Sequence, residues 1–261
     1  MPNKERTNHI GFICDGNGRW AKSKNKIRIE GHLAGMSSSI WKTLINWGKS
    51  NKYSHMSFYI FSTENWNRPK LEVSYLMLLF QELSSGSKWR KLMRDNDTKV
   101  NFIGEEVGLK RSLLKSMREI EEITKNNKGI NLTFCMNYGG KADILQAVNK
   151  CIAIGKTEIN EKEFEKHLRG DLPMIDILVR TGGSSRTSNF LPWHITYADM
   201  YFPSWYWPEL DREKLDLLTI DIDKRKRRFG GIGEEEYSGC EDKASEMVEE
   251  KTKELKAQGI L

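Results

Sequence analysis

Short apolar segments rich in β-branched and aromatic residues recur along the chain, and stretches with helical periodicity separate them. The candidate strands are residues 10–15, 55–62, 99–104, 130–138, 175–181 and 198–203. The candidate helices are residues 32–51, 70–94, 108–126, 141–154 and 161–169. Near-continuous apolar strands that alternate with helices are typical of parallel sheets covered on both faces. The pattern therefore predicts a single α/β domain with a central, mostly parallel, six-stranded sheet flanked by helices.

Polar and glycine-rich residues directly follow four of these strands, at residues 15–19, 62–65, 137–140 and 180–183. Parallel α/β sheets bind ligands beyond the carboxyl ends of their strands. We therefore expect these four segments to converge on one site.

The segment after the first strand reads DGNGR, from Asp15 to Arg19. Glycines let backbone N–H groups approach an anion, and an arginine is a forked donor for phosphate oxygens. Asp15 would repel a phosphate unless a cation lay between them, and Mg²⁺ is bound in proteins by one or two carboxylates together with substrate phosphates. The segment thus indicates a Mg²⁺–diphosphate site. A strand-to-helix turn capped by Asp15 is the alternative interpretation.

A second segment, RTGGSSRTSNF, places Arg180 and Arg186 around a hydroxyl-rich Gly-Gly turn. Together with Ser188 they can hold another diphosphate. The alternative, a surface turn with incidental arginines, is disfavoured because an unpaired charge at the end of an apolar strand would be costly. Arg28 and His32 form a further basic pair, for which a phosphate contact and a structural role both stay open.

Composition narrows the class of protein. The chain has 261 residues, of which 30% are charged, and a net charge of +6, which suits nucleic acid, acidic lipid or a phosphorylated small molecule. No apolar run approaches the roughly 20 residues of a membrane span, and the N-terminus lacks the apolar core of a secretory signal. The four cysteines show no metal-ligand spacing and indicate reduced thiols in a cytoplasmic protein.

Residues after 229 are charged and poor in apolar side chains. We expect one compact domain over residues 1–231, followed by a charged tail or surface helix over residues 232–261.

Seven segments then decide the interpretation: HIGFICDGNGRWA, KIRIEGHLAG, FSTENWNRP, NYGG, RTGGSSRTSNFLPW, TYADMYF and RRFGG. In this order they resemble the signature segments of the cis-prenyltransferases, such as undecaprenyl diphosphate synthase, over residues 8–231. The resemblance implies an isoprenoid-biosynthesis enzyme with a hydrophobic tunnel between sheet and helices. It implies a cytoplasmic homodimer that condenses an allylic prenyl diphosphate with isopentenyl diphosphate and contacts a membrane through its lipid product.

The resemblance also implies roles for individual residues. Asp15, Ser62 and Asn65 would be catalytic, and Mg²⁺ would be held by Asp15 and Asp199. The allylic diphosphate would contact Gly16, Asn17, Gly18, Arg19, Trp20, Arg28 and His32, with Trp66 and Arg68 completing the FSTENWNRP motif. Isopentenyl diphosphate would bind Arg180, Arg186 and Ser188, and the RRFGG segment of one subunit would help close this site in its partner.

The chain departs from the family pattern at a few positions. Ser184 and Ser185 replace Glu followed by Gln or His, and Asp199 replaces Glu. Ile60, Cys135 and Met136 stand where the family has small residues. If these side chains face the tunnel they narrow it, which predicts a short or medium chain product.

The altered RTGGSS loop leaves a second reaction open, an irregular, non-head-to-tail coupling with dimethylallyl diphosphate as acceptor. A subunit of a heteromeric cis-prenyltransferase is a third alternative, although the retained Asp15, Arg19 and Arg180 argue against a purely regulatory chain. Nucleic acid is not an expected partner, since the sequence shows no nucleic-acid-binding motif.

Overall fold

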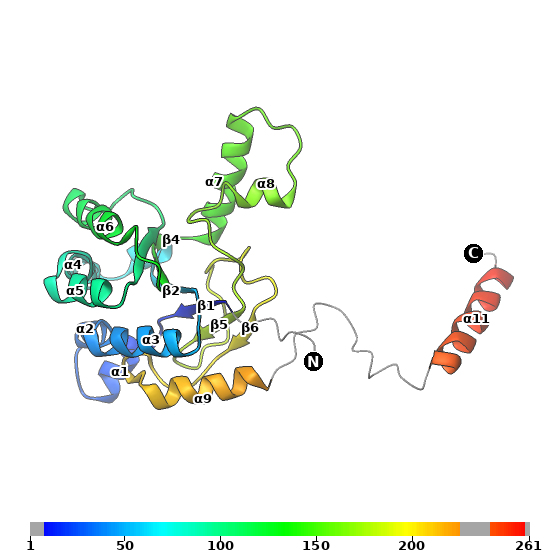
Figure 1. The fold of residues 1–261 in the computed structure, drawn as a ribbon, viewed down its shortest axis with the longest axis horizontal. Helices are drawn as coiled ribbons and strands as arrows, with labels where there is room; N and C mark the ends of the chain where they lie inside the picture. The colour runs from blue at the N-terminus through cyan, green and yellow to red at the C-terminus, as the bar shows by residue number, and fades with distance from the viewer. Residues whose placement is uncertain (1–7, 225–240, 259–261) are drawn as a thin grey trace. The chain divides into compact units, whose positions relative to one another are not determined.

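The computed structural model describes residues 8–224 and 241–258, and its centre is one six-stranded sheet (Figure 1). The strands are β1 (His9–Ile13), β2 (His55–Ser62), β3 (Lys99–Ile103), β4 (Asn131–Tyr138), β5 (Ile177–Arg180) and β6 (Asp199–Tyr201). They follow the order β3-β4-β2-β1-β5-β6, and each neighbouring pair is parallel. The predicted six-stranded parallel sheet is confirmed, and all carboxyl ends meet at one edge.

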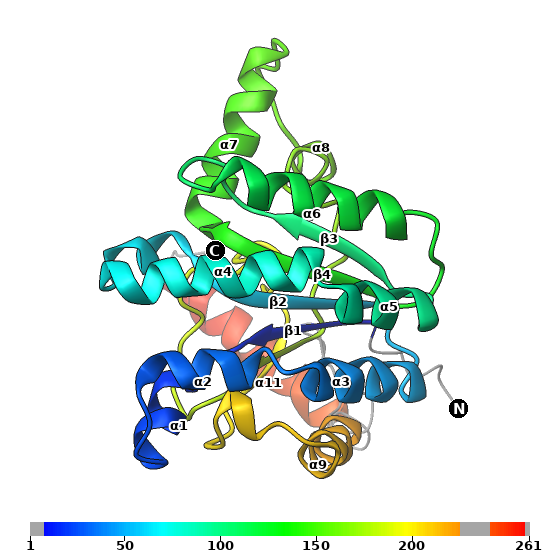
Figure 2. The same ribbon diagram turned by 90° about the vertical axis from the view of Figure 1, so that its left-hand side faces the viewer.

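The helices of the part that precedes residue 220 connect these strands. They are α1 (Asn17–Ser23), α2 (Arg28–Gly35), α3 (Ser38–Ser50), α4 (Lys70–Ser85), α5 (Ser87–Asp95), α6 (Arg111–Thr124), α7 (Gly140–Ala153) and α8 (Glu161–Glu165), with short 3-10 turns η1 (Thr63–Asn67) and η2 (Trp207–Glu209). Figure 2 shows α2–α6 on one face of the sheet. Three predicted helices were wrong in extent: residues 32–51 divide at Met36 and Ser37, residues 70–94 divide at Gly86, and the helix predicted at 161–169 ends at Glu165.

Under α2–α6, aromatic side chains fill the space between helices and sheet. Phe12, Phe58 and Phe134 stack in sequence across three neighbouring strands, with ring centroids 5.5 Å apart at each step. Trp41 lies edge-on to Phe58 at 5.0 Å and to Phe134 at 5.3 Å, and 5.9 Å from Trp207. We call these five side chains the aromatic layer. Each is almost fully buried, so the layer stabilises the fold through a large apolar area.

The opposite face of the sheet packs against the segment that joins β5 to β6. Phe190, Leu191 and Ile195 of this segment contact Ile13 and Tyr59, among other residues of the strands. Tyr59 stacks on Phe190 at 4.9 Å. The segment that carries Arg186 and Ser188 is therefore fixed to the sheet by its own apolar residues.

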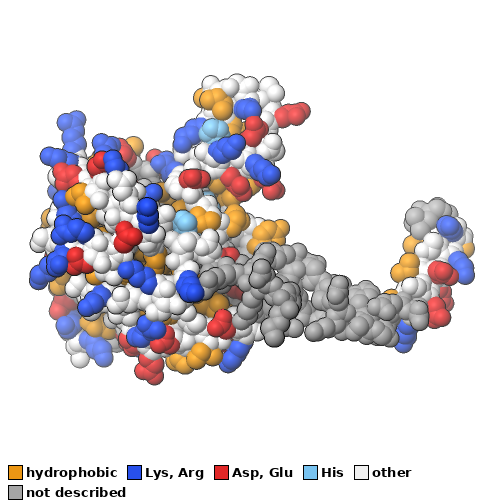
Figure 3. All heavy atoms as spheres, in the orientation of Figure 1, with side chains coloured by type: hydrophobic (Ala, Val, Ile, Leu, Met, Phe, Trp, Pro, Cys, Tyr) orange, Lys and Arg blue, Asp and Glu red, His pale blue; other side chains and the backbone are white. Residues whose placement is uncertain are grey.

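The chain forms two compact units, Met1–Thr219 and Ile220–Leu261. Helix α9 (Arg212–Asp223) contains this boundary, and α11 (Glu241–Ala257) belongs to the second unit. The expected boundary between residues 231 and 232, and the RRFGG segment, lie outside the described residues. Within the described ranges no helix is long and apolar enough to cross a bilayer. In Figure 3, Lys and Arg side chains are scattered over the surface among Asp and Glu side chains.

Candidate active site

The tip of β1 presents Asp15 to the edge where the strands end. Its Oδ1 accepts the N–H of Gly16 at 2.6 Å, and its Oδ2 lies 2.9 Å from Arg180 and 3.3 Å from Arg19. Burial opposes ionisation of this carboxyl, but the hydrogen bond and charge of Arg180 outweigh it, so the pKa of Asp15 is below its ordinary value. The side chain is therefore an anion held among cations at neutral pH.

Gly16 has a φ of +100°, in the left-handed region that side chains rarely adopt. A Cβ atom there would lie 2.6 Å from the ring of Tyr206. The same ring faces the guanidinium of Arg19 at 5.6 Å. Tyr206 thus packs against the turn that joins β1 to α1, and this contact requires glycine at position 16.

The tips of β1 and β5 are joined through one hydroxyl. Thr181 Oγ1 accepts the N–H of Asp15 at 3.0 Å and donates to the carbonyl of Asp15 at 2.6 Å. On its other side, the Asp15 carbonyl accepts the N–H of Trp207 at 3.0 Å. The backbone at Asp15 is consequently tied to two segments from the C-terminal part of the same unit.

Arg180 ends β5 and is buried, with 5% of its side chain exposed. Its Nη1 donates to the Arg186 carbonyl at 2.5 Å and to Ser188 Oγ at 2.7 Å, while Nη2 donates to Asp15. Its Nε is buried and has no hydrogen-bond partner among the described residues. The side chain of Arg186 is exposed. The structure therefore brings Arg180, Ser188 and the Arg186 backbone together beside Asp15.

Arg28, His32 and Arg68 meet at a carboxylate that sequence reasoning missed, Glu72 of α4. His32 Nε2 lies 3.1 Å from Oε1, Arg68 Nη1 lies 3.3 Å from Oε1, and Arg28 Nε lies 3.3 Å from Oε2. Burial opposes ionisation of Glu72, but hydrogen bonds from Arg28 and His32 outweigh it and lower its pKa. Burial, with the charges of Arg68 and Arg28, lowers the pKa of His32 even though Glu72 raises it. We call these four residues the Glu72 cluster.

Ser62 is the last residue of β2, and Asn65 and Trp66 follow it in η1. The Ser62 N–H donates to Asn65 Oδ1 at 3.1 Å. Trp66 Nε1 donates to Asn137 Oδ1 at 2.7 Å, and Asn137, with a φ of +50°, donates in turn to the carbonyls of Glu105 and Val107. Asn137 belongs to the NYGG segment at the end of β4, so the second and fourth strand ends are linked.

Asp199 does not lie at these strand ends. It pairs with Ile177 at the start of β5, and Arg180 follows three residues later, roughly 10 Å along the strand. Within one chain, Asp15 and Asp199 are therefore not brought together as ligands of one ion. Residues 8–224 and 241–258 contain no group of three or more His, Cys, Asp or Glu side chains that could hold a metal. The donor set at Asp15, one carboxylate among arginines, fits a Mg²⁺ ion that is bound together with a diphosphate.

A cavity of about 30 Å³ lies next to DGNGR, at the position expected for a tunnel. Asn17, His32, Ile60, Trp41 and Trp207 are among its lining residues, and Leu76 and Phe80 of α4 complete the apolar side. Ile60 therefore faces this space, as expected. Met136 packs against Phe61 and Phe80 on the same face of the sheet. Cys135 lies on the opposite face with Ile13 and Tyr59, so the expectation that it narrows the tunnel was wrong.

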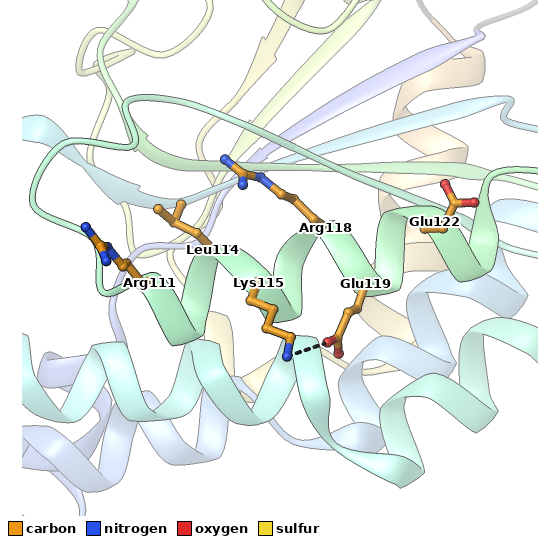
Figure 4. Close-up of a pocket in the computed structure, with 6 residues that line it drawn as sticks. All are labelled: Arg111, Leu114, Lys115, Arg118, Glu119 and Glu122. Carbon is orange, nitrogen blue, oxygen red and sulfur yellow. Dashed lines mark ion pairs between the residues drawn. The ribbon is translucent and has the colours of Figure 1, made fainter.

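A larger hollow of about 640 Å³ runs along α6 (Figure 4). All its lining residues stand on that one helix: Arg111, Leu114, Lys115, Arg118, Glu119 and Glu122. Lys115 and Glu119 form an ion pair across it. An open, mixed-charge helix face of this kind offers no convergent polar groups, so the candidate site remains at the strand ends.

The chain is similar to known proteins over most of its length. A family model described as "Putative undecaprenyl diphosphate synthase" matches residues 13–230. The chain belongs to the undecaprenyl diphosphate synthase family of cis-prenyltransferases. It is 41% identical over 228 residues to the isoprenyl transferase of Neisseria gonorrhoeae, covering 87% of this chain and 90% of the relative. The chain is accordingly a prenyltransferase.

Two further relatives differ in the activity that their names give. The chain is 38% identical over 241 residues to a ditrans,polycis-undecaprenyl-diphosphate synthase ((2E,6E)-farnesyl-diphosphate specific) of Legionella pneumophila, covering 90% of this chain and all of the relative. The crystal structure of lavandulyl diphosphate synthase from Lavandula x intermedia, in complex with dimethylallyl diphosphate, superimposes with a TM-score of 0.81 at 28% identity, covering 86% and 98% of the two chains.

Proposed function

We propose that this protein condenses an allylic prenyl diphosphate with isopentenyl diphosphate in a Mg²⁺-dependent reaction and releases a short or medium chain product. The observation that supports this most directly is the joined tips of β1 and β5, where Asp15 Oδ2 lies 3.3 Å from Arg19 and 2.9 Å from Arg180. The allylic diphosphate is assigned to DGNGR with Arg28 and His32. Isopentenyl diphosphate is assigned to Arg180, Arg186 and Ser188.

The reaction breaks the allylic C–O bond, and the pyrophosphate leaves with the electron pair. The alkene of the acceptor then forms a C–C bond to the allylic carbon, and loss of a proton creates the new double bond. The arginines stabilise the charge that develops on the leaving group. Mg²⁺ bound by Asp15 and the diphosphate would supply further Lewis-acid stabilisation. Because the tips of β1 and β5 are fixed to each other, the two substrate heads are held close, which makes the coupling effectively unimolecular.

Two groups can accept the proton. One is the departing pyrophosphate itself. The other is a relay through Ser62 and Asn65, in which the Ser62 backbone N–H holds the Asn65 side chain at the end of β2. The two proton acceptors can be distinguished, because only the relay requires the Ser62 hydroxyl or the Asn65 amide.

Support for a limited product length comes from the cavity. A space of about 30 Å³ holds roughly two water molecules, whereas ligand pockets commonly measure about 300–1,000 Å³. A prenyl tail therefore enters only if side chains move, and Trp41 and Trp207 of the aromatic layer are hard to displace because both are packed among other rings.

An irregular coupling is the second candidate. It is favoured by the likeness to lavandulyl diphosphate synthase, whose structure holds dimethylallyl diphosphate, and by Ser184 and Ser185 in the loop beside Arg180. Serine hydroxyls in this loop remove the negative charge that the family pattern places there, which changes how the acceptor head is held.

The assembly we propose is a cytoplasmic homodimer, with a membrane contact made through the lipid product. If Asp199 is a ligand of the ion at Asp15, as the family resemblance implies, it must come from a second chain, because within one chain it lies at the start of β6. A heteromeric enzyme would need the same contact from a different subunit.

A product assay tests these proposals. Purified protein and Mg²⁺ are incubated with isopentenyl diphosphate and allylic starters of increasing length, and then with dimethylallyl diphosphate as the only second substrate. Products are sized by chromatography and mass spectrometry. A ladder in five-carbon steps that needs isopentenyl diphosphate supports regular elongation, and a single coupling with dimethylallyl diphosphate supports the irregular reaction. No product from any pair would contradict a homomeric enzyme.

A further inference from the structure

Glu72 is an unusual residue to find beside a diphosphate site, because its charge repels a diphosphate. It lies in the first turn of α4, and only 8% of its side chain is exposed. Its two oxygens face Arg28 and His32 of α2 and Arg68 at the end of η1. A buried carboxylate is costly unless it is paired, and here three cationic or protonatable groups from two other elements converge on it.

The contacts orient these groups without using all their donors. Arg28 directs Nε and Nη2 to Glu72 at 3.3 and 3.4 Å, which leaves Nη1 unengaged by that carboxylate. These distances exceed the 2.7–2.9 Å or so of a tight charge-assisted hydrogen bond. The side chain of Arg28 is 58% exposed, so the remaining donors are accessible to an anion.

The orientation of Arg28 is also tied to DGNGR. A Cβ atom on Gly18 would lie 2.6 Å from both Cζ and Nη1 of Arg28, so the guanidinium lies directly on the glycine. Glu72 therefore holds Nη1 against the DGNGR segment, to which we assigned the allylic diphosphate. Without Glu72, the two arginines would repel each other and spread apart, and His32 would lose its hydrogen-bond partner.

We propose that Glu72 is a positioning residue for the allylic diphosphate: it fixes Arg28, Arg68 and His32 beside Gly18 before the substrate arrives. This inference rests on the proposed function, which places that substrate at DGNGR. Glu72 itself makes no contact with the diphosphate and acts through the three groups that it orients. Its negative charge lowers the net positive charge of the Glu72 cluster. Its orienting effect nevertheless raises the affinity of the site for the allylic diphosphate.

The test is Glu72→Gln, which keeps the size of the side chain and removes its charge. Positioning predicts that KM for the allylic substrate and Kd for inorganic pyrophosphate rise tenfold or more, while KM for the second substrate changes less than twofold. If Glu72 only repels the diphosphate, the variant binds pyrophosphate more tightly, which would overturn the proposal. Glu82→Gln, an exposed position on the same helix, is the matched control and should bind like the wild type.

A double-mutant cycle separates positioning from a general structural effect. In an Arg28→Ala background, Glu72→Gln should weaken pyrophosphate binding much less than it does in the wild type. An equal loss in both backgrounds would refute action through Arg28. Glu72→Asp keeps the charge and should recover part of the affinity, and thermal unfolding of each variant reports whether it is folded.

A failure of the Glu72 proposal can be distinguished from a failure of the proposed function. If the wild type binds pyrophosphate but forms no product from any substrate pair, the proposed reaction fails and the variant affinities still decide the role of Glu72. If the wild type does not bind pyrophosphate at all, both proposals are overturned.

Discussion

Replacing Trp41 by leucine should lengthen the product. Trp41 lines the cavity beside DGNGR and is 1% exposed, in edge-on contact with Phe58, Trp89 and Phe134. Leucine removes the bulk of the indole and leaves space where the growing chain would next extend. Each added prenyl unit brings five carbons, which at about 0.8 kcal/mol per buried carbon are worth about 4 kcal/mol once they are buried. A site that gains room for one unit therefore changes the preference for the next elongation step by up to roughly a thousandfold.

The substitution also lowers stability. Truncation of a buried tryptophan to alanine costs about 3–5 kcal/mol, and leucine costs less because it refills part of the space. Since domains are stable by about 5–15 kcal/mol, the variant should remain folded with a lower Tm. The products of wild type and variant are compared by chromatography and mass spectrometry at matched substrate concentrations.

Trp47→Leu is the matched control. Trp47 is fully buried and edge-on to Phe12, yet it does not line the cavity among the residues described there. It should lose similar stability and give the wild-type product distribution. Ile60→Ala opens the same cavity at another of its lining residues and should lengthen the product as Trp41→Leu does. Unchanged products from folded Trp41→Leu and Ile60→Ala, or equal lengthening by Trp47→Leu, would refute the assignment of this cavity to the prenyl chain.

Three further outcomes follow from the site and the core. Asp15→Asn should reduce product formation about a hundredfold or more and also lower Tm, because the amide keeps the shape but leaves the buried charge of Arg180 unbalanced and binds a cation less well; near-normal turnover in the folded variant would contradict the role of Asp15. Gly16→Ala should lower the free energy of unfolding by about 1–3 kcal/mol, measured by urea denaturation, because φ is +100° and Tyr206 blocks the new methyl group. Burial lowers the pKa of His9 to about 4. At His9 the unfolded chain therefore binds more protons between pH 4 and 6.5, so the contribution of His9 to the free energy of unfolding should be complete above pH 6.5 and fall by up to about 3 kcal/mol as the pH drops to 4. Burial lowers the pKa of His194 to about 4 as well, so His9→Gln should remove only the His9 share of this dependence, and an unchanged slope in urea titrations would contradict it.

The strand ends could be predicted from the sequence because parallel strands place their carboxyl ends together. This rule required only the apolar runs and the polar residues after them. It correctly predicted that the segments of Asp15 and Arg180 meet. Asp199 was assigned to the metal by the family resemblance and not by this rule. The strand predicted at residues 198–203 already places Asp199 near its amino end, and β6 does begin at Asp199, so within one chain Asp199 lies at the edge of the sheet opposite to Asp15.

Glu72 could not be found in the same way. It sits in a helical apolar pattern, and the only local signal was its spacing of four residues from Arg68, which usually marks a surface ion pair. Its burial arises from the packing of α2 against α4. The closed cavity had no local signal either, because Trp41 and Trp207 are distant in sequence and meet only after the sheet and its helices have assembled. The break at Gly86 was missed because apolar periodicity continues on both sides of it.

The hydroxyl of Thr181, which binds both the N–H and the carbonyl of Asp15, has an evolutionary consequence. In the proposed reaction this bond makes Asp15 part of the sheet, whereas Trp41, Leu76 and Phe80, which line the apolar side of the cavity, stand on α3 and α4. Mutations of these apolar side chains would then alter which lipid is made and leave the diphosphate-binding residues intact. A lineage carrying this fold could diversify its products by ordinary drift in apolar side chains, while selection on the strand tips preserves the chemistry.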